Sequence, residues 1–121
     1  MTPNFIMDII FKRKKDRDLV NNDSKLKQKY KGNQRRHKLI RARLDELADA
    51  ENLMTLRYLP QSNCHELKGN RKGQLAVNLD KGFRIIFEPA NIPIPEKKDG
   101  GLDWEVVTVV RILDLSEDYH E

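Results

Sequence analysis

The sequence has little of what holds small secreted or metal-bound domains together. It contains a single cysteine, Cys64, in 121 residues, so no intrachain disulfide can form. The three histidines at positions 37, 65 and 120 lack the close spacing of metal ligands. These absences exclude a disulfide scaffold and a zinc module, and we expect neither a metal nor another cofactor.

Long hydrophobic runs are also missing. No stretch approaches the roughly 18 consecutive apolar residues of a membrane span. The apolar start, residues 5–11, is interrupted by Asp8 and lacks a basic leader. We therefore expect a cytoplasmic protein that does not contact a membrane. Neither an internal repeat nor a low-complexity linker occurs, and the length fits one domain over residues 1–121.

Charge is plentiful and unevenly placed. Charged residues make up 35% of the chain and hydrophobic residues 38%, which favours a thin core of one sheet under one helical layer. The net charge is only +4, yet residues 12–43 hold 14 Lys and Arg against three Asp. Such a segment indicates contact with a polyanion or an acidic protein. The alternative is a solvated helix face.

The first half predicts a strand followed by helices. Alternation over residues 5–11 places Phe5, Met7, Ile9 and Phe11 on one apolar face. Helical spacing then predicts a short turn over residues 14–20, a helix from about residue 24 capped by Asn22 or Asp23, and a longer one from Asn33 to about Ala50. The longer helix has an apolar face and an outward cationic face. The apolar face comprises Ile40, Leu44, Leu47 and Ala48, and the cationic face Arg35, Lys38, Arg41 and, in part, Arg43.

The second half predicts a sheet. Residues 75–79 and 83–87 alternate around Asp80-Lys81-Gly82 and form a hairpin, whose parity turns Arg84 away from the face that buries Phe83. Prolines and a glycine pair take residues 89–103 out of the sheet, and residues 106–115 form a central strand. The fold class is therefore α+β: helices pack on one face of a mainly antiparallel sheet, and the other face stays partly free.

A partly free face could bind and cut RNA without a metal. Such cleavage drives the 2′-hydroxyl onto the adjacent phosphate, with one group removing that proton, another protonating the departing 5′ oxygen, and a cation stabilising the phosphorane. His65, His120 and Arg84 have the chemistry for these tasks.

Each candidate also has a purely structural interpretation. His65 could pack beside Leu67 and bond to the backbone, and Arg84 could pair with Glu88. Tyr119 and His120 could be a frayed end. Residues 68–73 could be a polar turn, and we interpret Cys64 as a small buried residue rather than a nucleophile.

Three motifs carry a resemblance to a known family. They are Cys64-His65-Glu66-Leu67-Lys68-Gly69-Asn70-Arg71-Lys72-Gly73, Phe83-Arg84-Ile85-Ile86-Phe87-Glu88-Pro89 and Glu117-Asp118-Tyr119-His120. In this order they resemble the plasmid maintenance killer branch, the HigB-like toxins of the RelE/ParE superfamily. The resemblance covers almost the whole chain and implies a RelE-like fold. It departs from the shortest members in the excursion over residues 89–103, which could clasp the antitoxin, touch the ribosome or extend a hairpin.

The resemblance implies the toxin of a type II toxin-antitoxin system, a ribosome-dependent endonuclease that cuts mRNA in the A site and is silenced by a cognate antitoxin. It implies His65 and His120 as the acid/base pair, Arg84 as the phosphorane stabiliser and Asp118 as the carboxylate that orients a histidine or raises its pKa. It further implies RNA-binding roles for Lys68, Arg71, Lys72 and Tyr119. Ribosomal RNA would then meet the basic segment, whose outer face could alternatively receive an acidic antitoxin.

Two other functions stay open. Within the same superfamily, a ParE-like protein binds DNA gyrase and hydrolyses nothing, because one small fold serves both activities. A catalytically silent module that binds RNA or an antitoxin would also satisfy the charge pattern. Both predict that the histidines are expendable.

Overall fold

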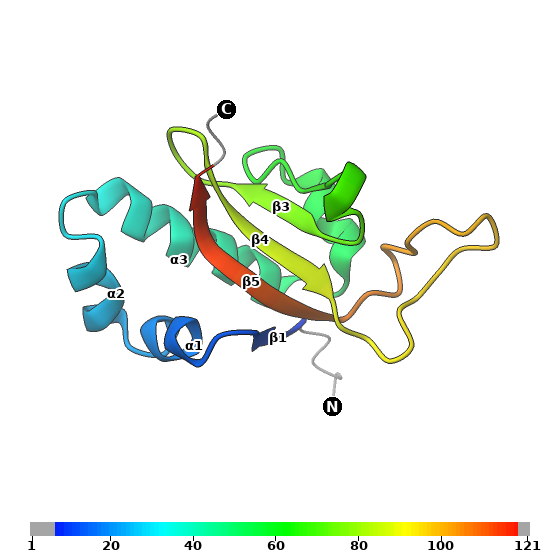
Figure 1. Cartoon of the computed structure of the whole chain (residues 1–121), viewed down its shortest axis with the longest axis horizontal. Coiled ribbons are helices and arrows are strands. Elements are labelled where there is room, and N and C mark those ends of the chain that lie inside the picture. The colour runs from blue at the N-terminus through cyan, green and yellow to red at the C-terminus, as the bar shows by residue number, and fades with distance from the viewer. Residues whose placement is uncertain (1–6, 119–121) are drawn as a thin grey trace.

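The computed structural model describes residues 7–118 as a five-stranded sheet with helices packed against it (Figure 1). The strands are β1 (Asp8–Phe11), β2 (His65–Glu66), β3 (Leu75–Asn78), β4 (Phe83–Pro89) and β5 (Val109–Asp118). Their order across the sheet is β1-β5-β4-β3-β2. Only the β1–β5 pair is parallel. The α+β class with a mainly antiparallel sheet is confirmed.

Three α-helices follow β1, the first of them where the spacing predicts a short turn and the other two where it predicts helices. They are α1 (Lys14–Val20), α2 (Asp23–Lys29) and α3 (Gln34–Asp49). Asn22 caps α2 by accepting from the backbone N–H of Lys25, and Asn33 caps α3 by accepting from that of Arg36 at 2.9 Å. In Figure 1, α3 runs behind the sheet, and α1 and α2 lie at the left of the view.

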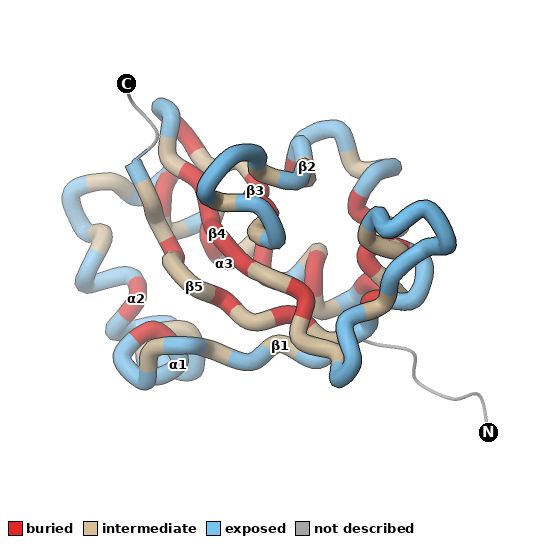
Figure 2. Tube along the Cα trace, turned by 45° about the vertical axis from the view of Figure 1, so that its right-hand side comes forward, coloured by how far each residue is buried: buried red, intermediate tan, exposed pale blue. Residues whose placement is uncertain are grey.

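The core fills the space between α3 and the sheet. Ile40, Leu44 and Leu47 of α3 are buried in one cluster with side chains from β3, β4 and β5. A 3₁₀ helix, η1 (Leu53–Tyr58), closes the core with Leu53 and Leu56. Buried backbone accordingly runs along α3 and through β4 in Figure 2.

Arg43 corrects the expected outward face of α3. Its side chain is 9% exposed, and it donates to the carbonyl oxygens of Asn78 at 2.9 Å and Gln61 at 3.0 Å. Arg43 lies three residues after Ile40 and four before Leu47, so it borders the apolar face, and its aliphatic stem can lie along the core while the guanidinium meets backbone carbonyls. The prediction that it faces outward is wrong.

The β3–β4 hairpin forms where alternation predicts it. Lys81 and Gly82 have φ values of 52° and 78°, and the N–H of Phe83 donates to the carbonyl of Asp80 at 2.9 Å. Positive φ at both central residues matches the twist of the flanking strands, and glycine takes this conformation without steric cost.

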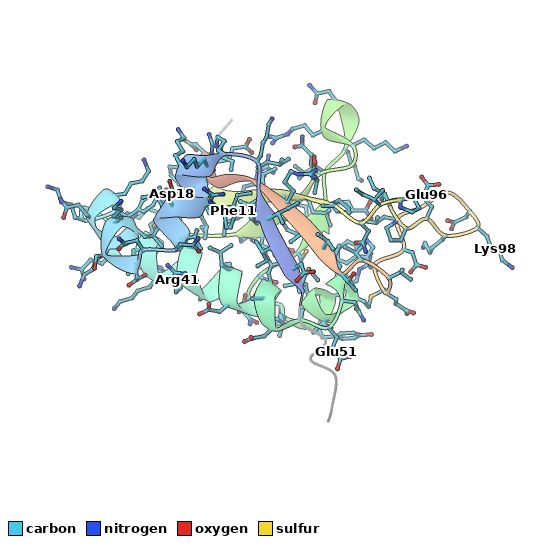
Figure 3. All side chains as sticks on the ribbon, turned by 90° about the horizontal axis from the view of Figure 1, so that it is seen from below. Phe11, Asp18, Arg41, Glu51, Glu96 and Lys98 are labelled. Carbon is cyan, nitrogen blue, oxygen red and sulfur yellow. The ribbon has the colours of Figure 1, made fainter. Side chains whose placement is uncertain are left out.

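β5 pairs on both sides, with β1 and with β4, so the predicted central strand exists but lies about three residues later. Between β4 and β5, residues 90–108 leave the sheet, with one isolated bridge between Glu96 and Leu102. Figure 3 shows Glu96 and Lys98 at the far end of this excursion, away from Asp18 and Arg41. Within residues 7–118, no helix is long and apolar enough to cross a membrane.

Candidate functional site

On the outer face of the sheet, opposite α3, the residues in the middle are buried, and clefts open toward the two ends of β4. Register aligns His65 with Ala76 and Ala76 with Ile86. Ala76 and Ile86 are fully buried although they do not belong to the core cluster. The outer face is thus exposed only in part, which agrees with the expectation of a partly free face.

A cleft of about 280 Å³ opens on this face where β4 begins. It is lined by Asn63, His65, Asn78, Leu79, Gly82, Phe83 and Arg84, and we name it the His65 cleft. Two residues that the sequence singled out separately, His65 and Arg84, therefore line one cleft. The β2–β3 and β3–β4 pairings bring them there.

His65 is half-buried and oriented by the backbone. Its Nδ1 lies 2.7 Å from the carbonyl oxygen of Asn63, which has a positive φ of 45°. Because a carbonyl only accepts, Nδ1 carries the proton and Nε2 of the neutral ring is the basic nitrogen. The hydrogen bond to the backbone that the structural interpretation of His65 expects is therefore present, and the same ring also lines the cleft.

Arg84 pairs with Glu117, a carboxylate to which the sequence interpretation gave no role. Its side chain is 7% exposed, and Nε and Nη2 each lie 2.9 Å from Oε2 of Glu117. The alternative pairing with Glu88 is wrong, since Glu88 pairs with Arg111 at 2.8 Å. Register explains the difference: Glu117 lies directly opposite Arg84, whereas Glu88 lies four residues along the same strand, roughly 13 Å away.

The loop between β2 and β3 presents three cations. Lys68 and Lys72 are exposed, whereas Arg71, in the 3₁₀ turn η2 (Gly69–Arg71), turns toward the sheet. Nη1 of Arg71 lies 2.8 Å from Oε1 and 2.9 Å from Oε2 of Glu117. One carboxylate therefore holds two guanidinium groups, Arg71 and Arg84.

Asp118 is the last residue that the structure describes. It is exposed and pairs in register with Phe83, which lines the His65 cleft. The predictions for Tyr119 and His120 lie outside the described residues.

Arg36 supports the cleft from the helical side. It makes a buried ion pair with Asp80, donates to Oγ of Ser116 at 3.2 Å, and stacks 3.6 Å from the ring centroid of Phe83. One side chain of α3 thus joins the β3–β4 turn, the start of β4 and the end of β5. From the sequence, Arg36 was only one of the cations of the basic segment. Its partners lie more than forty residues away in the chain, and local spacing cannot reveal them.

Two ionisable groups near the cleft have shifted pKa values. Burial raises the pKa of Asp80, but hydrogen bonds from Arg36 and Asn33 outweigh it and hold the pKa below its ordinary value. Partial burial raises the pKa of the Cys64 thiol to about 12, in keeping with a structural cysteine rather than a nucleophile.

The cleft combines an imidazole with a fixed guanidinium, groups that can remove a proton and stabilise an anion. Among residues 7–118, no three His, Cys, Asp or Glu side chains are grouped so as to hold a metal ion. No family model matches the chain, and comparison with curated proteins and with solved structures gave no significant match.

Proposed function

We propose that this chain is the toxin of a type II toxin-antitoxin system and a ribosome-dependent mRNA endonuclease. The observation that carries the proposal is that His65 and Arg84 line one cleft on the outer face of the sheet. A base and a phosphate-binding cation in one cleft suit attack of the RNA 2′-hydroxyl on the adjacent phosphate.

His65 is the general base in this proposal. Its Nδ1 bond to Asn63 leaves Nε2 to take the proton of the 2′-hydroxyl. Arg84 stabilises the phosphorane as charge develops on it. A positioned base contributes roughly 10²- to 10⁴-fold in rate.

His120 is then the general acid, and Asp118 orients it. The support comes from chain length: Asp118 pairs with Phe83 at the cleft, and His120 follows two residues later, a separation of roughly 7 Å at most. Tyr119 stacks on an unpaired base of the message.

The cations hold the polyanion. Lys68, Arg71 and Lys72 contact phosphates next to the scissile one. In the basic segment, nine cations are exposed and make no ion pair with any residue in the range 7–118: Lys12, Lys14, Lys15, Lys25, Lys27, Lys29, Lys31, Arg35 and Lys38. They suit ribosomal RNA, or an acidic antitoxin segment, in the cytoplasm.

The deciding experiment maps the 5′ ends of mRNA after brief expression, with and without the neighbouring antitoxin. His65→Ala lowers ribosome-dependent cleavage by about 10²- to 10⁴-fold while ribosome binding stays unchanged. His37→Ala is the matched control, because Nε2 of His37 lies 3.0 Å from Oδ1 of Asp23 and His37 is not among the residues that line the His65 cleft. Equal cleavage by His65→Ala and the parent chain would remove the nuclease proposal.

A further inference from the structure

Glu117 is a carboxylate shared by two arginines of the outer face, Arg71 and Arg84. Arg71 belongs to the loop before β3 and Glu117 to β5, so their ion pair crosses β3 and β4. Arg84 reaches the same carboxylate from β4. The three side chains form a cluster that we name the Arg71–Glu117–Arg84 cluster.

The two arginines depend on Glu117 to different degrees. Arg84 stands on a central strand with a buried side chain, so its backbone and packing already fix it. Arg71 stands on a short loop, and its side chain is 33% exposed. Within residues 7–118, its side chain donates hydrogen bonds to Glu117 and one from Nε to Oε1 of Gln74 at 3.0 Å. Two guanidinium groups that meet at one carboxylate repel each other, and the negative charge offsets that repulsion.

The geometry also leaves Arg71 a donor for a ligand. Nε and Nη1 are engaged, whereas Nη2 donates no hydrogen bond to any residue that the structure describes. A planar guanidinium held through two of its nitrogens presents the third in a fixed direction. That arrangement suits a phosphate oxygen beside the one that Arg84 contacts.

We infer that Glu117 is a positioning residue for RNA: it holds Arg71 against β5, so that Arg71 and Arg84 contact neighbouring phosphates of one single strand. The inference rests on the proposed function, because it takes the strand in the His65 cleft to be RNA. Glu117 itself touches no substrate. Its loss therefore acts through Arg71.

The test measures binding of a 2′-O-methyl RNA oligonucleotide, which cannot be cleaved through its 2′ position, by the full chain at several salt concentrations. Glu117→Gln and Arg71→Ala each weaken binding by about three- to tenfold. Each also makes the slope of log K against log salt shallower by about 0.7, the value for one lost phosphate contact on a single strand. The double variant is no weaker than either single one.

Glu88→Gln is the matched control. Glu88 also pairs with an arginine, Arg111, on the outer face of β4 and β5, and its loss leaves affinity and slope unchanged. A purely structural role of Glu117 would lower the unfolding temperature without changing the slope. If Glu117→Gln lowers the folded fraction, Gln74→Leu removes the other hydrogen bond on Arg71 and must make the slope shallower as well.

Two results overturn the inference. One is an unchanged slope in the folded variants. The other is tighter binding with a steeper slope in Glu117→Gln, which would make Glu117 a competitor of the phosphate. Failure of this inference can be told apart from failure of the proposed function. If Glu117→Gln keeps the salt slope of the parent chain while His65→Ala loses cleavage, only the inference about Glu117 is wrong. If Glu117→Gln has a shallower salt slope while His65→Ala cleaves as the parent chain does, only the nuclease proposal is wrong.

Discussion

Arg36 places a charged guanidinium in the interior of the protein, where an ion pair and a hydrogen bond stabilise it. Its guanidinium donates to Asp80 and to Ser116, and its plane lies over Phe83. Arginine tolerates such a place because its charge is delocalised and weakly hydrated and its face can stack on a ring. Phe83 lines the His65 cleft, and Asp80 lies in the turn between the cleft residues Leu79 and Gly82, so the geometry of the cleft depends on Arg36, which does not line it.

Removing one partner of this buried ion pair is costly. Arg36→Met leaves the carboxylate of Asp80 without its counter-ion, so we expect the free energy of unfolding to fall by about 3 kcal/mol or more. Arg35→Met is the control, because Arg35 is exposed and a change there stays within about 0.5 kcal/mol. Urea unfolding at neutral pH measures both. Equal losses would mean that the buried pair contributes nothing beyond surface charge.

The same pair predicts how stability depends on pH. Asp80 has a folded-state pKa below its ordinary value of 3.8, so its contribution is fully present above that value and disappears as pH falls through the folded pKa. We expect Asp80→Asn to be less stable at neutral pH, and the difference from the parent chain to shrink below about pH 4. Urea unfolding across that range measures it. Parallel curves would contradict the argument.

Cys64 is expected to be unreactive for a physical reason. With a thiol pKa of about 12, raised by burial, only roughly one molecule in ten thousand is a thiolate at about pH 8. Iodoacetamide should therefore alkylate the folded chain very slowly and the urea-unfolded chain fast. Cys64→Ala should cut mRNA as the parent does. Fast labelling of the folded chain would show that the thiol is ionised.

At the scale of elements, the two helix caps offer a matched comparison. Asn22 only caps α2, through a bond of 3.3 Å at the surface. Asn33 caps α3 and also donates from Nδ2 to Oδ2 of Asp80 at 3.1 Å. We expect Asn33→Ala to lower the free energy of unfolding by about 2 kcal/mol, cap and hydrogen bond together, and Asn22→Ala by about 0.5 to 1 kcal/mol. Thermal or urea unfolding measures both losses. Equal losses of unfolding free energy in the two variants would show that the hydrogen bond from Asn33 to Asp80 adds nothing.

Local patterns predicted the elements better than their registers. Period-two alternation and the Asp80-Lys81-Gly82 turn suffice for the hairpin, because both act between neighbours in the chain. The pairing of Arg84 with Glu117 depends instead on β4–β5 register, which shifts twice between Arg84 and Phe87. No alternation pattern reveals such shifts. For that reason the sequence placed Arg84 on the outer face but did not name its partner.

At the scale of the whole molecule, the strands assemble the candidate site from distant segments. Residue chemistry alone could select His65 and Arg84, but only the β2–β3–β4 pairing brings them to one cleft. The basic segment is a different case. Its excess charge is visible in the sequence, whereas folding decides which cations remain unpaired: the acids of the segment pair with Arg13, Arg17, His37 and Arg41, which leaves mainly lysines exposed.

These lysines should strengthen ribosome binding without taking part in chemistry. Lys25 and Lys29 are exposed four residues apart on α2, on one side of that helix. We expect Lys25→Gln with Lys29→Gln to weaken ribosome binding, to make its salt dependence shallower, and to leave the rate of cleavage at saturating ribosomes unchanged, because His65 and Arg84 are untouched.

The control removes equal charge elsewhere. Lys97 and Lys98 lie on the excursion, and Figure 3 shows Lys98 at the other end of the molecule from Arg41. Lys97→Gln with Lys98→Gln changes the net charge by the same amount, so any effect of total charge must appear in both double variants. Equal weakening in the two would mean that the ribosome senses net charge alone. Weakening confined to the α2 pair would instead assign the contact to the basic segment, where nine exposed cations make no ion pair with any residue in the range 7–118.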